Sequence, residues 1–220
     1  MVSGYAVKEM FLTLQGEGVQ SGRRAVFLRF AGCNLWSGRE QDRATADCTF
    51  CDTDFVGIDG DGGGRFGDAA EVAARAVALW DQGLAEPDAR RFIVLTGGEP
   101  TLQIDAALIA ALKDAGFEIA MESNGTLPAP AGLDWICVSP KAGTQIVQRD
   151  GNELKLVWPQ PGMDTMAMEE WRFDHLLVQP MDGPNGNGGG HNARDACIAF
   201  VLAHPRWRLS VQTHKMVGLR

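Results

Sequence analysis

Short apolar runs that are typical of β-strands alternate along this chain with segments that are typical of α-helices. The strand-like runs are residues 25–30, 92–95, 117–122, 135–138, 154–157, 175–178 and 207–211. Amphipathic helices are predicted over residues 68–82, 105–115 and 192–204. Alternation of this kind predicts βαβ units and a mainly parallel sheet. Because fewer helices than strands are visible, the sequence favours an α/β protein with an incomplete barrel.

Composition limits the kind of protein to which this sheet can belong. The 220 residues fit one domain, residues 1–220, and a hydrophobic content of 45% is enough for a sizeable core. No apolar run reaches the roughly 20 residues that span a bilayer. The net charge of −8 and the lack of a Lys/Arg-rich run weigh against nucleic acid as the direct substrate. The first residues do not resemble a secretion signal, so we expect a cytoplasmic protein with no membrane partner.

The loop after the first predicted strand carries three cysteines in the spacing C-x14-C-x2-C, namely Cys33, Cys48 and Cys51. Three thiolates can hold three irons of a [4Fe–4S] cluster and leave the fourth iron open to a small molecule. A structural zinc site needs a fourth Cys or His, and the histidine nearest in sequence is His175. The spacing alone leaves an iron–sulfur site, a zinc site and no metal as open alternatives. Cys137 and Cys197 lie in apolar runs and are expected to be buried thiols.

A second motif, Gly-Gly-Glu-Pro at residues 97–100, follows the strand-like run 92–95. Two glycines allow another molecule to approach the backbone closely, and the Glu99 carboxylate can accept hydrogen bonds from an ammonium group. An ordinary turn between strand and helix is the alternative. Active-site loops gather at the carboxyl ends of parallel strands, so we expect this motif and the cysteine loop to meet there.

Together the two motifs resemble the radical S-adenosylmethionine superfamily, although the common spacing there is C-x3-C-x2-C. Within that superfamily the chain resembles the 7-carboxy-7-deazaguanine synthase family, which includes members with an expanded cysteine loop. The resemblance extends over residues 13–18, 51–54, 122–126, 139–141, 178–182 and 212–215. It implies a pared-down (β/α)6 TIM-like barrel. In that barrel, residues 31–54 form the cluster loop and residues 192–220 close the substrate site.

The resemblance also implies the cofactors and their ligands. Cys33, Cys48 and Cys51 would hold a [4Fe–4S] cluster whose open iron binds S-adenosylmethionine. Residues implied in binding S-adenosylmethionine are Phe50, Cys51, Asp52, Gly98, Glu99, Ser139, Pro140, Lys141, Gln179, Pro180, Met181 and Asp182. Thr53 would be a ligand of Mg²⁺, which prefers hard oxygen atoms. From the residues alone, a turn threonine is the stronger interpretation of Thr53, and an ordinary strand exit or turn is the alternative for the Ser-Pro and Gln-Pro pairs.

A pterin substrate is implied by the same resemblance. Gln15 and Glu17 offer hydrogen-bonding groups that suit a pterin edge, and Arg29 can bind a carboxylate bidentately. An outward-facing strand arginine is the alternative for Arg29. The implied substrate-binding residues are Leu14, Gln15, Gly16, Glu17, Arg29, Thr96, His214 and Arg220, the last through its terminal carboxylate. Relatives end in proline rather than arginine, so the last contact depends on the backbone.

The implied reaction converts 6-carboxy-5,6,7,8-tetrahydropterin into 7-carboxy-7-deazaguanine, with loss of ammonia, in queuosine and deazapurine biosynthesis. A radical derived from S-adenosylmethionine would take hydrogen from C6 and return it after ring contraction. Flavodoxin or ferredoxin would donate the electron, and a homodimer is expected. Two alternatives are a glycyl-radical activase, against which the Gln15 and Glu17 pair argues, and a zinc-binding module without catalysis.

Overall fold

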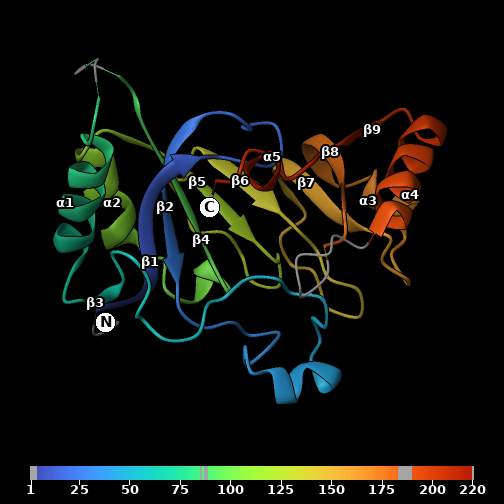
Figure 1. Ribbon diagram of the computed structural model, residues 1–220, viewed down its shortest axis with the longest axis horizontal. Helices are drawn as coiled ribbons and strands as arrows, with labels where there is room; N and C mark the ends of the chain where they lie inside the picture. The colour runs from blue at the N-terminus through green and yellow to red at the C-terminus, as the bar shows by residue number, and fades with distance from the viewer. Residues whose placement is uncertain (1–3, 85, 87–88, 183–189, 220) are drawn as a thin grey trace.

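The computed structural model describes residues 4–84, 86, 89–182 and 190–219, and it contains one mixed sheet of nine strands. The strand order is β3-β1-β2-β4-β5-β6-β7-β8-β9. The parallel part comprises β2 (Arg24–Phe30), β4 (Arg91–Gly97), β5 (Phe117–Ser123), β6 (Trp135–Val138), β7 (Asp150–Trp158), β8 (Arg172–Pro180) and β9 (Trp207–Leu209). The sheet curves but does not close (Figure 1). This confirms the predicted mainly parallel, incomplete barrel.

Two strands at one edge of the sheet were not predicted. β1 (Tyr5–Leu14) pairs antiparallel with β2 and with β3 (Gly64–Phe66). The middle of β1 carries Lys8 and Glu9, which break the apolar pattern that marks a strand, yet both are almost fully buried. Lys8 pairs with Asp54 and Asp59, and Glu9 pairs with Arg29. β9 is shorter than predicted, since it ends at Leu209 rather than at residue 211.

Local sequence explains where the longer helices begin. The Asp68 side chain accepts a hydrogen bond from Glu71 N at the start of α1 (Ala69–Trp80), and Asp105 caps α2 (Ala106–Asp114) through Leu108 N. α4 (Gly190–Ala203) is the third predicted helix. The short helices are α3 (Thr165–Met168), α5 (Thr213–Met216) and the 3₁₀ turns Glu40–Thr45 and Pro100–Leu102.

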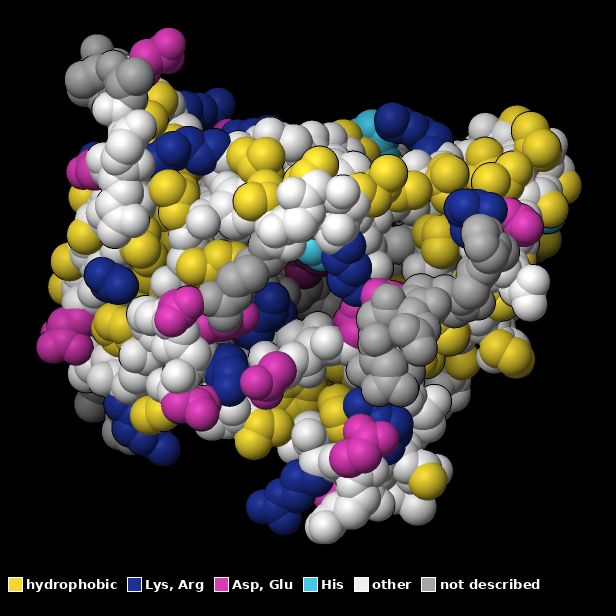
Figure 2. Space-filling model, viewed as in Figure 1, with side chains coloured by type: hydrophobic (Ala, Val, Ile, Leu, Met, Phe, Trp, Pro, Cys, Tyr) yellow, Lys and Arg dark blue, Asp and Glu magenta, His cyan; other side chains and the backbone are white. Residues whose placement is uncertain are grey.

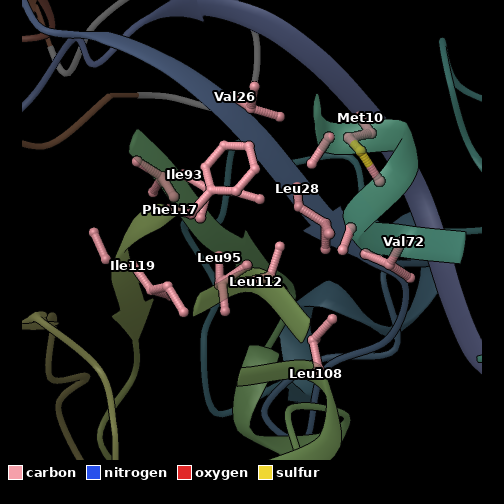
Figure 3. Packing of buried hydrophobic residues seen from close by; sticks show 14 of the residues in the cluster. Met10, Val26, Leu28, Val72, Ile93, Leu95, Leu108, Leu112, Phe117 and Ile119 are labelled. Atoms are coloured by element: carbon pink, nitrogen blue, oxygen red, sulfur yellow. The ribbon is translucent and has the colours of Figure 1, made fainter. Parts of the chain in front are cut away.

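The hydrophobic core is divided between the two ends of the sheet. Beneath α1 and α2, side chains such as Leu28, Ile93, Leu108 and Ile119 are fully buried or nearly so (Figure 3). A second cluster lies between β6, β7, β8 and α4 and includes Trp207. Because the helices and their apolar contacts cover one face, the opposite face and the carboxyl ends of the parallel strands are left to polar loops.

Candidate active site

One cavity of about 540 Å³ lies at the carboxyl ends of the parallel strands, where Figure 2 shows a hollow with charged side chains around its opening. The predicted site residues that line it are Leu14, Gln15, Gly16, Glu17, Arg29, Cys33, Cys48, Phe50, Cys51, Asp52, Thr53, Thr96, Gly98, Ser139, Lys141, Gln179, Pro180, Asp182 and His214. Glu99, Pro140 and Met181 are not part of the lining, and Arg220 lies outside the described residues. The predicted residues are therefore brought together, and their individual roles stay predictions.

The three loop cysteines face this cavity as free thiols. Cys48 donates a hydrogen bond to Cys51, which lowers the pKa of Cys51 to about 6 although burial acts in the opposite direction. The same hydrogen bond, together with burial, raises the pKa of Cys48. Burial also raises the pKa of the Cys33 thiol. The loop thus carries one thiol that is already inclined to ionise, which is the form that binds iron.

The three cysteines fit a [4Fe–4S] cluster better than a single zinc ion. Within the described ranges, no three His, Cys, Asp or Glu side chains converge closely enough to hold one metal ion, as a zinc site requires. A [4Fe–4S] cluster instead takes each thiolate on a different iron. The partly buried Lys141 interacts electrostatically with Cys48 and Cys51, and its ammonium group can balance thiolate charge. The residues present therefore suit an iron–sulfur cluster.

The 14 residues between the first two cysteines form an ordered extension, which projects at the bottom of Figure 1. The Arg43 guanidinium lies 4.1 Å above the Trp36 ring and donates hydrogen bonds to the carbonyl oxygens of Thr49 and Cys51, at 3.0 and 2.9 Å. Trp36 packs edge-on against Phe55, with 5.6 Å between ring centroids. The extension therefore fixes the backbone of the segment from Cys48 to Cys51.

The Gly-Gly-Glu-Pro segment packs directly against the start of the cluster loop. A Cβ at Gly98 would lie 2.2 Å from Gly32 O and 2.7 Å from Cys33 Cβ, so only glycine allows this close approach. The Glu99 carboxylate is fully buried and accepts hydrogen bonds from Thr101 N and Oγ1, Ser123 Oγ and Asn124 N. Four internal donors occupy the side chain that was predicted to meet an ammonium group, and here they tie β4 to β5.

Two lysines connect the loops implied in cofactor binding. Lys141 donates to Ser139 O and Oγ at 2.7 and 2.8 Å. Lys215 of α5 bridges Asp52 of the cluster loop, at 2.9 Å, and Asp182 after β8. The C-terminal helix is therefore joined by charge to both loops that flank the opening.

A charged network lies on the substrate side of the cavity. Lys155 Nζ is 2.6 Å from Glu17 Oε2 and 2.9 Å from Glu122 Oε2. Gln15 Nε2 donates to Glu122 Oε1 at 2.6 Å, and Gln212 Nε2 donates to Glu17 Oε1 at 2.8 Å. Burial alone would raise the pKa of Glu17, but the Lys155 charge and the hydrogen bonds lower it to about 2. Burial would lower the pKa of Lys155, but the charges of Glu122 and Glu17 hold it well above its usual value.

Arg29 faces the cavity from β2, beside Thr96 in the register of the neighbouring strand β4. Its Nε donates to Glu9 Oε1 at 2.8 Å, so its charge is paired inside the sheet. A guanidinium held through Nε presents its two terminal nitrogens in a defined direction, as carboxylate binding requires. The alternative of an outward-facing arginine is wrong.

The two aspartates that flank Thr53 are each paired with a lysine. Asp52 is paired with Lys215, and Asp54 is paired with Lys8 at 2.9 Å. Thr53 lines the cavity, and within the described part of the chain its hydroxyl has no hydrogen-bond partner. An oxygen in this position is available to a ligand.

His214 is placed by a single glycine. A Cβ at Gly16 would lie 1.9 Å from His214 Nδ1, and Thr213 N donates to Gly16 O at 2.8 Å. Both residues were predicted site residues, and this contact is the reason that they share one wall. It also explains why the segment 14–17 requires glycine at its third position.

Sequence reasoning missed several residues that line the cavity. These are Lys8, Glu9, Glu122, Ser123, Asn124, Lys155, Gln212 and Lys215, together with apolar neighbours. Glu122 and Gln212 begin two of the segments that carried the family resemblance, so those segments held the signal. Lys155 had a different signal, because it is a lone lysine inside an otherwise apolar strand-like run.

Comparison with known proteins agrees with this geometry. The family model described as "Radical SAM superfamily" matches residues 41–155, more than half of the chain. The chain therefore belongs to the radical S-adenosylmethionine superfamily, and membership implies a [4Fe–4S] cluster and S-adenosylmethionine. Among the described residues, no helix is long and apolar enough to cross a membrane.

Similar proteins identify the family to which the chain belongs within this superfamily. The chain is 58% identical over 215 residues to the 7-carboxy-7-deazaguanine synthase of Caulobacter vibrioides and 55% identical to that of Bordetella pertussis. In both comparisons the match covers 98% of this chain and 99% of the relative. The crystal structure of QueE from Escherichia coli matches with a TM-score of 0.65 and 25% identity, over 96% of this chain and 95% of that one. The chain thus belongs to the 7-carboxy-7-deazaguanine synthase family, and neither alternative function is supported.

Proposed function

We propose that this protein converts 6-carboxy-5,6,7,8-tetrahydropterin into 7-carboxy-7-deazaguanine, with loss of ammonia, in the cytoplasm. The observation that carries the proposal is a single cavity with three free thiols on one wall and the Gln15, Glu17 and Arg29 side chains on another. When bound, the cluster and S-adenosylmethionine supply the one-electron chemistry that removes hydrogen from C6. The protein positions the substrate and excludes water from the radical.

The predicted substrate-binding side chains have complementary groups on this pterin. The Glu17 carboxylate accepts from N–H groups of the 2-amino-4-oxo ring edge, and Gln15 adds a donor and an acceptor. Arg29 binds the 6-carboxylate, with Glu9 fixing the guanidinium from behind at 2.8 Å. Thr96 and His214 contact the substrate from the strand end and from α5.

The remaining partners belong to the same proposal. The Thr53 hydroxyl would hold Mg²⁺, which would supply positive charge for the substrate carboxylate during ring contraction. Flavodoxin or ferredoxin delivers the electron, and the active enzyme is a homodimer.

Anaerobic assay of the reconstituted protein tests the function. Wild type, incubated with the carboxytetrahydropterin, S-adenosylmethionine and reductant, should yield the deazaguanine product on mass spectrometry. Cys48→Ala should lose bound iron and all turnover, because it removes one of the three cluster thiols. Cys197→Ala is the matched control, since this thiol is fully buried beside Trp158 and away from the cavity. Product from Cys48→Ala, or none from wild type, would refute the proposal.

A further inference from the structure

Lys155 is a charged residue in the cavity wall for which the proposed substrate contacts give no role. Its side chain is 4% exposed, and it reaches the cavity from the middle of β7. A buried ammonium group is costly unless it is paired, so its partners determine what it does. Those partners are Glu17 and Glu122, which come from the loop after β1 and from β5.

The Glu17 and Glu122 carboxylates are far apart in the sequence, but both contact the same atom, Lys155 Nζ. Both accept from Lys155 Nζ through Oε2, and each also accepts through Oε1 from a glutamine side chain, Gln212 or Gln15. Two carboxylates this close to each other would repel, and one would take up a proton if no cation lay between them. The Lys155 ammonium group lies between the two carboxylates and offsets this repulsion.

Other charged groups surround this triad. Glu153 and the Cys137 thiol contribute to the field at Lys155, and Lys141 opposes it. His214 lines the same cavity from α5. Among these groups, Lys155 is the cation in direct contact with both Glu17 and Glu122.

We infer that Lys155 is a positioning residue that holds the Glu17 and Glu122 carboxylates side by side as hydrogen-bond acceptors, so that the cavity selects a ring edge with adjacent N–H donors. The inference rests on the proposed pterin substrate. A 2-amino-4-oxo edge presents an amino group next to a ring N–H, and both donate. A 2,4-dioxo edge replaces the amino donor with a carbonyl acceptor, which an ionised carboxylate repels. Sites with buried polar groups discriminate strongly against such replacements, because those groups are left unpaired.

Binding can be measured without turnover. The probe is the oxidised pterin-6-carboxylate, whose fluorescence reports its dissociation constant on iron-loaded protein with S-adenosylmethionine, between pH 5.5 and 7.5. The comparison ligand is the 2,4-dioxo analogue, lumazine-6-carboxylate. Wild type should bind the pterin at least about tenfold more tightly than the lumazine, with little pH dependence from the two carboxylates.

Lys155→Met should bind the pterin at least about tenfold more weakly at pH 5.5 and should regain part of that affinity at pH 7.5, as the paired carboxylates ionise without their cation. Its preference for pterin over lumazine should shrink. The double variant Lys155→Met/Glu122→Gln removes the like-charge pair and should lose most of the pH dependence. Lys113→Met is the matched control, because Lys113 lies on α2, pairs with Asp134 and is not part of the cavity lining, so its substitution should leave both affinities unchanged.

The outcomes distinguish a failure of the proposed pterin substrate from a failure of the positioning role of Lys155. If wild type fails to bind the pterin, the proposed substrate is wrong and the inference fails with it. If wild type binds, but Lys155→Met has a lower melting temperature with an unchanged pH profile and unchanged ligand preference, Lys155 is only structural. The proposed substrate would then stand while the role of Lys155 is overturned.

Discussion

Thr53 shows how a single residue can be left available by its neighbours. Its two flanking aspartates are each neutralised by a lysine, Asp52 by Lys215 and Asp54 by Lys8. A metal ion is therefore not needed to relieve repulsion between the Asp52 and Asp54 carboxylates. The case for Mg²⁺ instead rests on the threonine oxygen in the cavity wall and on the substrate carboxylate that the proposed reaction brings.

Substitution of Thr53 should separate a metal ligand from a turn residue. Activity of chelator-treated wild type should rise with added Mg²⁺, and Thr53→Ala should lose most of that response because the ligand oxygen is gone. Thr53→Ser keeps the oxygen and should keep part of the response. Product formation is titrated against Mg²⁺ at fixed S-adenosylmethionine and reductant. Identical Mg²⁺ curves for wild type and Thr53→Ala would assign the metal to other groups.

At the scale of elements, α5 connects three parts of the chain that are distant in sequence. Thr213 Oγ1 donates to Gly16 O at 2.9 Å, and Gln212 reaches Glu17. Lys215 joins this short helix to the cluster loop and to the segment after β8. A four-residue helix has little stability of its own, so these contacts determine its position.

Lys215→Met should loosen α5 without unfolding the protein. Both ion pairs are partly exposed, so the loss of stability should stay near or below about 1 kcal/mol. The KM for S-adenosylmethionine should rise several-fold, because Asp52 and Asp182 lose their shared partner beside the cavity. Limited proteolysis should cut more readily near residue 213 than in wild type. Lys113→Met again serves as control, and unchanged KM and cleavage in Lys215→Met would show that α5 is held by its other contacts.

The elements differ in how far sequence could predict them. The strands β2 and β4 to β8 were predicted because their apolar runs are buried on both faces, as parallel strands between layers require. β1 escaped prediction because Lys8 and Glu9 interrupt it, and their partners at Asp54 and Arg29 are known only from the tertiary structure. α5 has too few residues for a helical period.

The candidate site was predictable to the extent that it lies at strand ends. Loops such as those of Cys33 and Gly98 combine residues with clear chemistry with positions at the carboxyl ends of predicted strands. Lys155 could not be assigned in this way, because its role depends on two glutamates from other segments. Likewise, the sequence could not show that the Glu99 carboxylate is occupied by four internal donors.

At the scale of the whole molecule, the open barrel contains glutamates whose pKa values are shifted in opposite directions. Glu153 on β7 is 3% exposed; its carboxylate accepts from Val19 N at 2.9 Å and from Cys137 Sγ at 3.4 Å. Burial raises the pKa of Glu153 above its usual value of 4.5. Glu118 lies at the other end of the strands and pairs with Arg23, whose hydrogen bond lowers the pKa of Glu118.

These opposite shifts predict opposite pH dependence. Between pH 4.5 and its raised pKa, folded Glu153 binds more protons than the unfolded chain does, so the free energy of unfolding falls as pH rises. Glu118 has a lowered pKa, so its contribution is fully present above about pH 4.5 and is lost only as pH falls below that value. From pH 5 to pH 8, Glu153 should therefore change the stability of the protein and Glu118 should not.

Glu153→Gln should be less sensitive to pH than wild type. The amide oxygen can still accept from Val19 N, but the group no longer titrates, so the cost of ionising a buried carboxyl at pH 8 disappears. Each unit of raised pKa corresponds to about 1.4 kcal/mol, or roughly 3–6 °C in melting temperature for a protein of this size. Melting temperatures are measured anaerobically on iron-loaded protein at pH 5 and pH 8. Glu118→Gln should lower both values by a similar amount, because it removes an ion pair that is charged throughout this range. Parallel changes from pH 5 to pH 8 in wild type and Glu153→Gln would mean that Glu153 keeps an ordinary pKa inside the fold.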